Sequence, residues 1–134
     1  LFGAKIGKNV VIRPSVKITY PWKLTLGDYA WVGDDAVLYT LGDITIGANS
    51  VVSQKCYLCT GSHDFMSPHF DITATPIVIG EKCWLATDVF VAPGVSVGDG
   101  TVIGARSSVF KSLPANKVCR GNPAVVIRER VETE

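Results

Sequence analysis

Both histidines of this chain lie in one polar segment near its middle, where His63 directly precedes Asp64 and His69 follows six residues later. An imidazole can accept a proton from a hydroxyl group near neutral pH, so His63 is a candidate general base. The plainer interpretation is a loop histidine that hydrogen-bonds to its own turn. We expect His69 to be solvated or to have a packing role.

The rest of the chain repeats every six residues, with aliphatic residues that are often followed by glycine. The aliphatic positions are Ile6, Ile12, Ile18 and Leu24; Leu26, Val32, Leu38 and Ile44; Ile46, Val52 and Leu58; and Ile79, Leu85, Val91, Val97, Ile103 and Val109. Neither a helix nor a simple strand has a period of six, whereas a chain that turns a corner every six residues does. The repeat therefore predicts an all-β parallel β-helix of hexapeptide repeats, with three sides and about five coils.

Two positions of each repeat are expected to point inward: the aliphatic residue and the small residue four places later. The glycine after the aliphatic residue is expected to supply permissive backbone angles at the corner. By this count Ser62 points inward and His63 points outward. Counting back one coil from His63 reaches Asp43 or Thr45, so Asp43 and Asp64 are candidates to orient the imidazole.

The longest interruption of the repeat lies between Leu58 and Ile79 and contains the polar segment. Coiled architectures place insertions in loops on one face, which is often the binding face. We therefore expect a protruding loop at 59–76 and regard it as the leading functional segment.

The repeat ends after Val109, and Asn122-Pro123 is typical of a helix start. A short C-terminal helix is expected to cap the open end of the stack. The whole chain, 1–134, is predicted to be one domain, with the β-helix at 4–113 and the cap at 114–134. Since the chain starts at Leu1 and a repeat begins almost at once, we also expect a segment to precede it.

Composition argues against several classes of function. The net charge of +1 produces no strong general field that would favour nucleic acid or an anionic membrane. No apolar run is long enough to span a membrane. Cys56 and Cys59 have the CxxC spacing of zinc or redox sites, but no second pair of ligands follows. The cysteines are expected to be buried residues in a reducing, cytoplasmic compartment, with no metal bound.

Several motifs carry a resemblance to a known family. They are Pro76-Ile77-Val78-Ile79-Gly80, Cys83-Trp84, Ala92-Pro93-Gly94-Val95, Ile103-Gly104-Ala105 and Gly121-Asn122-Pro123-Ala124. The chain resembles the hexapeptide-repeat acyltransferases over nearly all its length. Its loop Gly61-Ser62-His63-Asp64 looks like the catalytic loop of maltose, galactoside and polysaccharide O-acetyltransferases, and most like that of the colanic-acid biosynthesis acetyltransferases.

This resemblance implies a left-handed β-helix and a homotrimer. It also implies transfer of an acetyl group from acetyl-CoA to a sugar hydroxyl in extracellular polysaccharide biosynthesis. The acceptor oxygen would attack the thioester directly while His63 removes its proton.

The resemblance also implies a set of residues that bind acetyl-CoA. Trp84 would line the cleft where pantetheine and acceptor meet, and the backbone N–H near Thr87 would stabilise the developing oxyanion. Ala105 would lie beside the pantetheine. Lys111 and Arg128 match basic positions that meet the nucleotide phosphates.

The chain departs from the family pattern at Arg106 and Phe110, where Gly and Thr are common. Tyr39 and Tyr57 are the aromatic residues nearest to the His63 loop in the count. Either could stack on a sugar ring or contact another subunit.

Three other functions remain open. A nucleotide-sugar N-acetyltransferase differs only in that an amine attacks. A non-catalytic β-helix scaffold would have an uninterrupted repeat, unlike this chain. A zinc carbonic anhydrase on the same scaffold needs three histidine ligands, whereas this chain has only His63 and His69.

Overall fold

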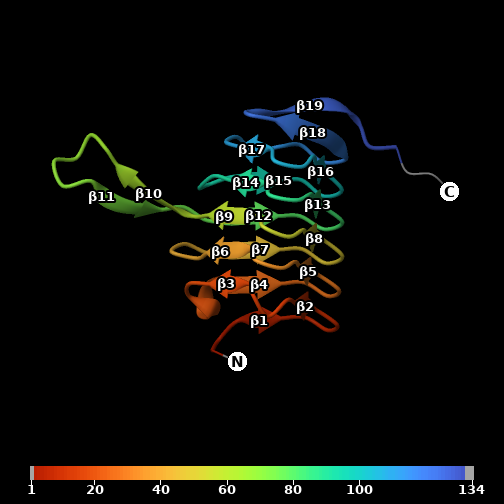
Figure 1. Ribbon diagram of the computed structural model, residues 1–134, viewed down its shortest axis with the longest axis horizontal. Helices are drawn as coiled ribbons and strands as arrows, with labels where there is room; N and C mark the ends of the chain where they lie inside the picture. Colours follow the sequence, from red (N-terminus) through yellow and green to blue (C-terminus); the bar gives the residue numbers. More distant parts are fainter. Residues whose placement is uncertain (1, 132–134) are drawn as a thin grey trace.

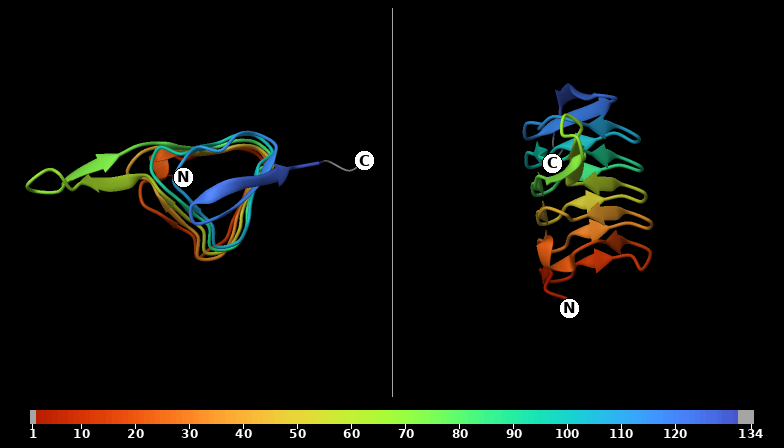
Figure 2. Two further views of the ribbon diagram at one scale, coloured as in Figure 1. Left: turned by 90° about the horizontal axis from the view of Figure 1, so that it is seen from above. Right: turned by 90° about the vertical axis from the view of Figure 1, so that its left-hand side faces the viewer.

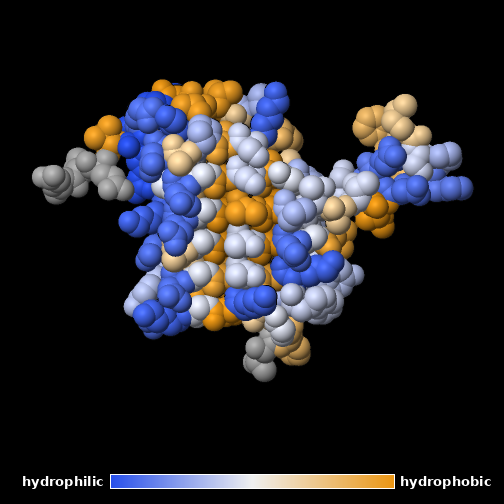
Figure 3. Space-filling model, turned by 180° about the vertical axis from the view of Figure 1, so that it is seen from behind, coloured by the Kyte–Doolittle hydropathy of each residue, from blue (hydrophilic) through white to orange (hydrophobic). Residues whose placement is uncertain are grey.

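The structure is a computed structural model that describes residues 2–131. These residues form a three-sided parallel β-helix in which short strands stack from one coil to the next, and the coils superpose as a triangle when seen along the stack (Figures 1 and 2). Seen from behind, a flat face of the stack shows vertical columns of pale and apolar side chains, while strongly hydrophilic side chains gather at its edges (Figure 3).

Three sheets make the three sides, and each complete coil passes through them in the order A, B, C. Sheet A contains β1 (Lys5–Ile6), β4 (Leu24–Leu26), β7 (Ile44–Ile46), β12 (Ile77–Ile79) and β15 (Ser96–Val97). Sheet B contains β2 (Val11–Ile12), β5 (Trp31–Val32), β8 (Val51–Val52), β13 (Trp84–Leu85), β16 (Val102–Ile103), β18 (Lys117–Gly121) and β19 (Ala124–Glu129). Sheet C contains β3 (Lys17–Ile18), β6 (Val37–Tyr39), β9 (Tyr57–Cys59), β14 (Phe90–Val91) and β17 (Ser108–Val109).

Five coils are complete, and a partial sixth begins with the bridge between Val97 and Leu113 and continues into β18. The all-β coiled fold predicted from the repeat is therefore confirmed. A short helix, η1 (Pro21–Lys23), lies in the connection from β3 to β4. Within residues 2–131 we find no helix with the length and apolar character needed to cross a membrane.

The core is the column of side chains inside the triangle. From Leu26 onward, the repeat aliphatic residues are almost completely buried, and so are the small residues four places later, such as Ala36 and Cys56. Parallel pairing keeps each aliphatic side chain directly above its equivalent, as in Leu26, Ile46 and Ile79. The prediction of two inward positions per repeat is therefore confirmed for the stack.

The corner geometry differs from the expectation for glycine. The residues with positive φ stand three places after the repeat aliphatic residue, as at Asn49 (φ 59°) and Lys82 (φ 54°). The glycine one place after the aliphatic residue has a different purpose: a Cβ at Gly47 would lie 2.6 Å from the carbonyl carbon of Gly80 in the next coil. Glycine is required there because neighbouring backbones approach closely.

The predicted C-terminal helix is wrong. Residues 117–129 form an antiparallel hairpin, in which β18 continues sheet B beside β16 and β19 covers the outer edge of β18. Ala124–Glu129 is rich in valine and isoleucine, which favour strands. The outer edge of β18 would otherwise be unpaired, and pairing with it makes these residues a strand. This pairing outweighs the local helix-start signal of Asn122-Pro123.

The predicted loop at 59–76 is a second antiparallel hairpin that projects from the corner between sheets C and A (Figure 2). Its strands are β10 (Gly61–Asp64) and β11 (Asp71–Ala74). Thr60 anchors its base, since its hydroxyl donates to the Tyr39 carbonyl at 2.5 Å and accepts from the Gly42 N–H at 2.8 Å. The hairpin therefore leaves the coil at a fixed angle, which positions the residues that it carries.

Candidate active site

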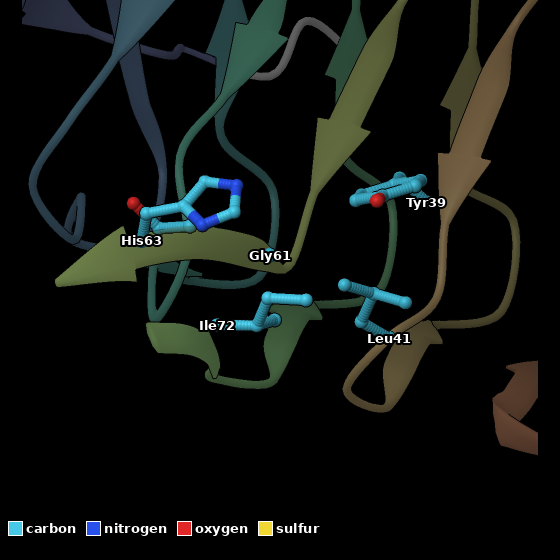
Figure 4. Close-up of a pocket in the computed structure, with 6 residues that line it drawn as sticks. Tyr39, Leu41, Gly61, His63 and Ile72 are labelled. Atoms are coloured by element: carbon cyan, nitrogen blue, oxygen red, sulfur yellow. The ribbon is translucent and has the colours of Figure 1, made fainter. Parts of the chain in front are cut away.

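A small pocket of about 90 Å³ lies where the hairpin leaves the stack. Its lining residues are Tyr39, Leu41, Gly61, Ser62, His63 and Ile72. Figure 4 shows the His63 imidazole and the Tyr39 ring on opposite sides of this space, with Leu41 and Ile72 also at its border. A Cβ at Gly61 would lie 2.7 Å from Leu41 Cδ1, so glycine allows the close approach that forms the pocket floor.

His63 is held by a backbone carbonyl of its own hairpin. Its Nδ1 lies 2.7 Å from the carbonyl oxygen of Phe70, and its backbone is in register with Ile72 of β11. A carbonyl oxygen only accepts hydrogen bonds, so Nδ1 carries the hydrogen and Nε2 keeps a free lone pair. This is the tautomer that a general base requires, with Nε2 as the atom that takes the proton.

Phe70 makes this contact from a tight turn. Its φ of 50° is positive, and its N–H donates to the Ser67 carbonyl at 3.1 Å. Asp64 stabilises the other side of the turn, because its Oδ1 accepts from the Met66 N–H at 3.0 Å. The turn therefore aims the Phe70 carbonyl back at the imidazole.

The predicted orienting roles of Asp43 and Asp64 stay predictions. Asp43 lies beneath the base of the hairpin, where its carbonyl accepts from the Ile77 N–H at 3.0 Å. Within residues 2–131, neither carboxylate is hydrogen-bonded to His63, whose Nδ1 contacts Phe70 instead. Ser62 is exposed and lines the pocket, so the expectation that it points into the core is wrong. His69 is exposed in the hairpin turn, as expected.

A second group of predicted residues lies at a different corner. Thr87 and Ala105 stand in adjacent coils at the corner between sheets B and C, which we call the B–C corner. The Arg106 N–H donates to the Thr87 carbonyl at 2.8 Å and ties these two coils together. Trp84 begins β13 on the same side, half exposed, with its Nε1 donating to the Ser53 hydroxyl at 2.9 Å.

The corner that carries the hairpin, between sheets C and A, is the C–A corner. Lys111 lies at the C–A corner, in the connection after β17, while Arg128 lies on β19 opposite Val118. Sheet C separates the His63 hairpin from Thr87 and Ala105 within one chain (Figure 1). Trp84 lies on β13 of sheet B and is not among the residues that line the His63 pocket within one chain.

Reasoning from the sequence missed most of the pocket wall. The Phe70 carbonyl is a backbone atom, so its role does not depend on the type of residue 70 and cannot be read from the sequence. Leu41 and Ile72 are aliphatic residues with no reactive group that would have marked them as pocket residues. Only Tyr39 could have been found, because strand pairing places it one coil beneath Cys59, at the point where the repeat breaks.

The cysteines are free thiols, and three of the four are buried. Burial raises the pKa of the Cys56 thiol to about 11 and also raises the pKa of the Cys83 and Cys119 thiols. In residues 2–131, no three or more His, Cys, Asp or Glu side chains gather as possible metal ligands. Cys56, Cys83 and Cys119 are therefore small core residues of the stack.

These thiols should react slowly in the native protein. A pKa of about 11 instead of 9.0 lowers the thiolate fraction of Cys56 near pH 8 by roughly 100-fold, and only the thiolate attacks a disulfide reagent. With Ellman's reagent, we expect half-buried Cys59 to react first and all four thiols to react after unfolding in guanidinium. Rapid labelling of Cys56 in the folded protein, located by mass spectrometry, would contradict this burial.

Comparison with known proteins agrees with this architecture. The family described as Bacterial transferase hexapeptide (six repeats) matches residues 76–111. Over 134 residues the chain is 89% identical to the Escherichia coli (strain K12) protein assigned as the colanic acid biosynthesis acetyltransferase WcaF, covering 100% of this chain and 74% of that protein.

Two solved structures extend the comparison. The structure of a maltose O-acetyltransferase from Clostridium difficile 630 has a TM-score of 0.89 at 27% identity, covering 96% of this chain and 70% of that one. A galactoside acetyltransferase in complex with coenzyme A has a TM-score of 0.90 at 30% identity, covering 95% of this chain and 65% of that one. The expected family resemblance is confirmed. The chain belongs to the hexapeptide-repeat acetyltransferases, together with the WcaF protein.

Proposed function

We propose that this acetyltransferase moves an acetyl group from acetyl-CoA to a sugar hydroxyl, with His63 as the general base, in the biosynthesis of an extracellular polysaccharide. The observation that carries the proposal is the 2.7 Å contact between His63 Nδ1 and the Phe70 carbonyl, which leaves Nε2 ready to accept a proton at the pocket. The similarity to the colanic acid acetyltransferase supports the polysaccharide context, and the similarity to the CoA-bound structure supports the donor.

The proposed reaction needs no covalent enzyme intermediate. Nε2 of His63 removes the hydroxyl proton as the sugar oxygen attacks the thioester carbonyl. The carbonyl oxygen gains negative charge, and the Thr87 N–H, which has no acceptor among residues 2–131, is the proposed donor to it. The tetrahedral intermediate then collapses, the C–S bond breaks, and the thiolate of CoA takes the proton from the imidazolium.

We further propose a homotrimer, because the two halves of the site lie on different corners of one chain. His63 extends from the C–A corner, whereas Thr87 and Ala105 stand at the B–C corner, and sheet C lies between them. If three copies turn sheet C toward a common axis, the C–A corner of one copy lies against the B–C corner of the next. This arrangement joins His63 of one copy to Thr87 of its neighbour.

The outer face of sheet C is suited to this inner position. Four aromatic rings form a ladder across it, with centroid separations of 6.4 Å for Tyr39 to Tyr57, 6.2 Å for Tyr57 to Phe90 and 6.0 Å for Phe90 to Phe110. Tyr57 is 39% exposed and Phe110 is 52% exposed in the single chain. Aromatic residues are enriched in the buried centres of interfaces, so this aromatic ladder is the proposed contact surface.

We place the reaction in the cytoplasm. All four cysteines are free, which is the state that a reducing compartment maintains.

The proposed reaction is tested by measuring release of the CoA thiol from acetyl-CoA in the presence of candidate acceptors. Nucleotide sugars and lipid-linked oligosaccharide analogues with free hydroxyls should support turnover, and mass spectrometry should find an alkali-labile ester in the product. Preference for amino sugars, with an alkali-stable amide as product, would instead favour N-acetylation. No turnover with any acceptor, together with no CoA binding, would favour the non-catalytic scaffold.

A further inference from the structure

The basic residues near the upper end of the stack fall into two groups by their contacts. Arg130 has a structural role, since its Nη1 donates to the carbonyls of Lys82 at 2.8 Å and Gly100 at 2.9 Å. Lys117 is paired with Glu129 across the C-terminal hairpin. By contrast, the Arg120 side chain has no hydrogen-bond or ion-pair partner among residues 2–131. The Arg106 side chain has only a loose ion pair, with 3.8 Å between its Nε and Asp88 Oδ2.

Arg106 and Arg120 lie on the same edge as the predicted thioester and pantetheine positions. Arg106 directly follows Ala105, and its N–H bonds the Thr87 carbonyl one coil below. Arg120 stands one coil above Gly104, because a Cβ at Gly104 would lie 3.1 Å from Arg120 Cβ. The B–C corner therefore presents, from the middle of the stack upward, the Thr87 N–H, which has no acceptor among residues 2–131, a small residue at Ala105 and two guanidinium groups.

The contacts of Arg106 differ from those of the arginine at the first coil of this corner. Arg13 donates from Nε to Asp34 Oδ1 at 3.1 Å, so its charge is already compensated. The Arg106 side chain is 82% exposed, and its Nε lies 3.8 Å from Asp88 Oδ2. Two neighbouring guanidinium groups, one without a partner and one only loosely paired with Asp88, favour a ligand with several anionic oxygens, because each planar guanidinium can bind two such oxygens.

We propose that Arg106 and Arg120 form an additional phosphate-binding subsite for CoA at the B–C corner. This inference rests on the proposed function for the direction in which CoA lies, and it adds two residues to Lys111 and Arg128. Lys111 stands at the C–A corner, so in the proposed trimer it approaches the B–C corner of the neighbouring copy. The phosphates would then be held between cations of two protomers.

Direct binding tests this subsite without requiring an acceptor sugar. The Kd for CoA is measured by calorimetry on the assembled protein. We expect it to rise roughly tenfold in each single variant, Arg106→Gln and Arg120→Gln, because each variant loses a charge-assisted contact to phosphate. Pantetheine, which lacks the phosphates, should bind the double variant and the unsubstituted protein equally well. Arg13→Gln, the same change at the far end of this corner, is the matched control and should leave the Kd unchanged.

Salt dependence separates an electrostatic role from a structural one. Raising the salt concentration should weaken CoA binding by the unsubstituted protein more than binding by the double variant, since exposed charges are screened. An unchanged Kd for CoA in the double variant, or an equal loss of pantetheine binding, would overturn the proposal. The proposal would also be overturned if the arginine substitutions changed only the KM for an acidic acceptor and left CoA binding unaffected. If the arginine variants lose CoA affinity while no sugar is acetylated, the sugar assignment fails and this subsite stands.

Discussion

His63→Ala is expected to lower kcat by at least about 100-fold with little change in the KM for acetyl-CoA, because the variant loses the general base but keeps the edge that binds CoA. The imidazole is exposed on a hairpin and contributes nothing to the core, so the melting temperature and the oligomeric state should not change. The measurement is steady-state release of the CoA thiol with an accepted sugar.

The chain provides a matched control in the same hairpin. His69 is exposed in the turn, six residues after His63, and no role in the reaction is assigned to it. His69→Ala should retain full activity within about twofold, a small effect that is typical of exposed surface sites. Full activity in His63→Ala would remove this residue from the mechanism, and equal losses in both variants would indicate a disturbed hairpin.

Tyr57→Asp is expected to dissociate the trimer and to reduce activity to near the background rate. A carboxylate in the centre of the aromatic ladder would be buried without a partner, a cost of several kcal/mol in each of the three copies. Since each proposed site needs residues from two protomers, a separated chain would have no complete site. Analytical ultracentrifugation reports the mass of the assembly, and thiol release reports the activity.

Val78→Asp introduces the same carboxylate on sheet A and is the control. Val78 is 43% exposed and Tyr57 is 39% exposed, so the two substitutions should change the stability of the single chain by similar amounts. We expect Val78→Asp to remain trimeric, because sheet A faces away from the proposed axis. Dissociation by Val78→Asp while Tyr57→Asp stays assembled would assign the interface to sheet A.

The period of six was enough to predict the coiled stack, because it specifies which side chains share the interior regardless of distant contacts. Ile46, Leu58 and Ile79 are buried where the count places them. The interruption after Leu58 likewise predicted the segment that projects from the stack, since an insertion must leave a coil whose interior is already full. The handedness and the trimer came from family resemblance and stay predictions.

Other features depend on contacts that local patterns do not contain. Asn122-Pro123 carries a valid helix-start signal, yet the open edge of β18 makes the following residues a strand. The contact to His63 comes from the carbonyl of Phe70, a backbone atom whose position depends on the turn of the hairpin. Ser62 follows the hairpin rather than the repeat, so counting through the insertion placed it on the wrong side.

The most direct test of a site shared between neighbouring chains is complementation in mixed trimers. His63→Ala lacks the base, Ala105→Trp should block the pantetheine edge, and each variant alone should be inactive. When the two are co-expressed in equal amounts and mix at random, about one quarter of the sites would combine an intact His63 with an intact Ala105 from its neighbour. We predict roughly that fraction of the unsubstituted activity. Activity no higher than that of either parent would show that each site lies within one chain and would contradict the account.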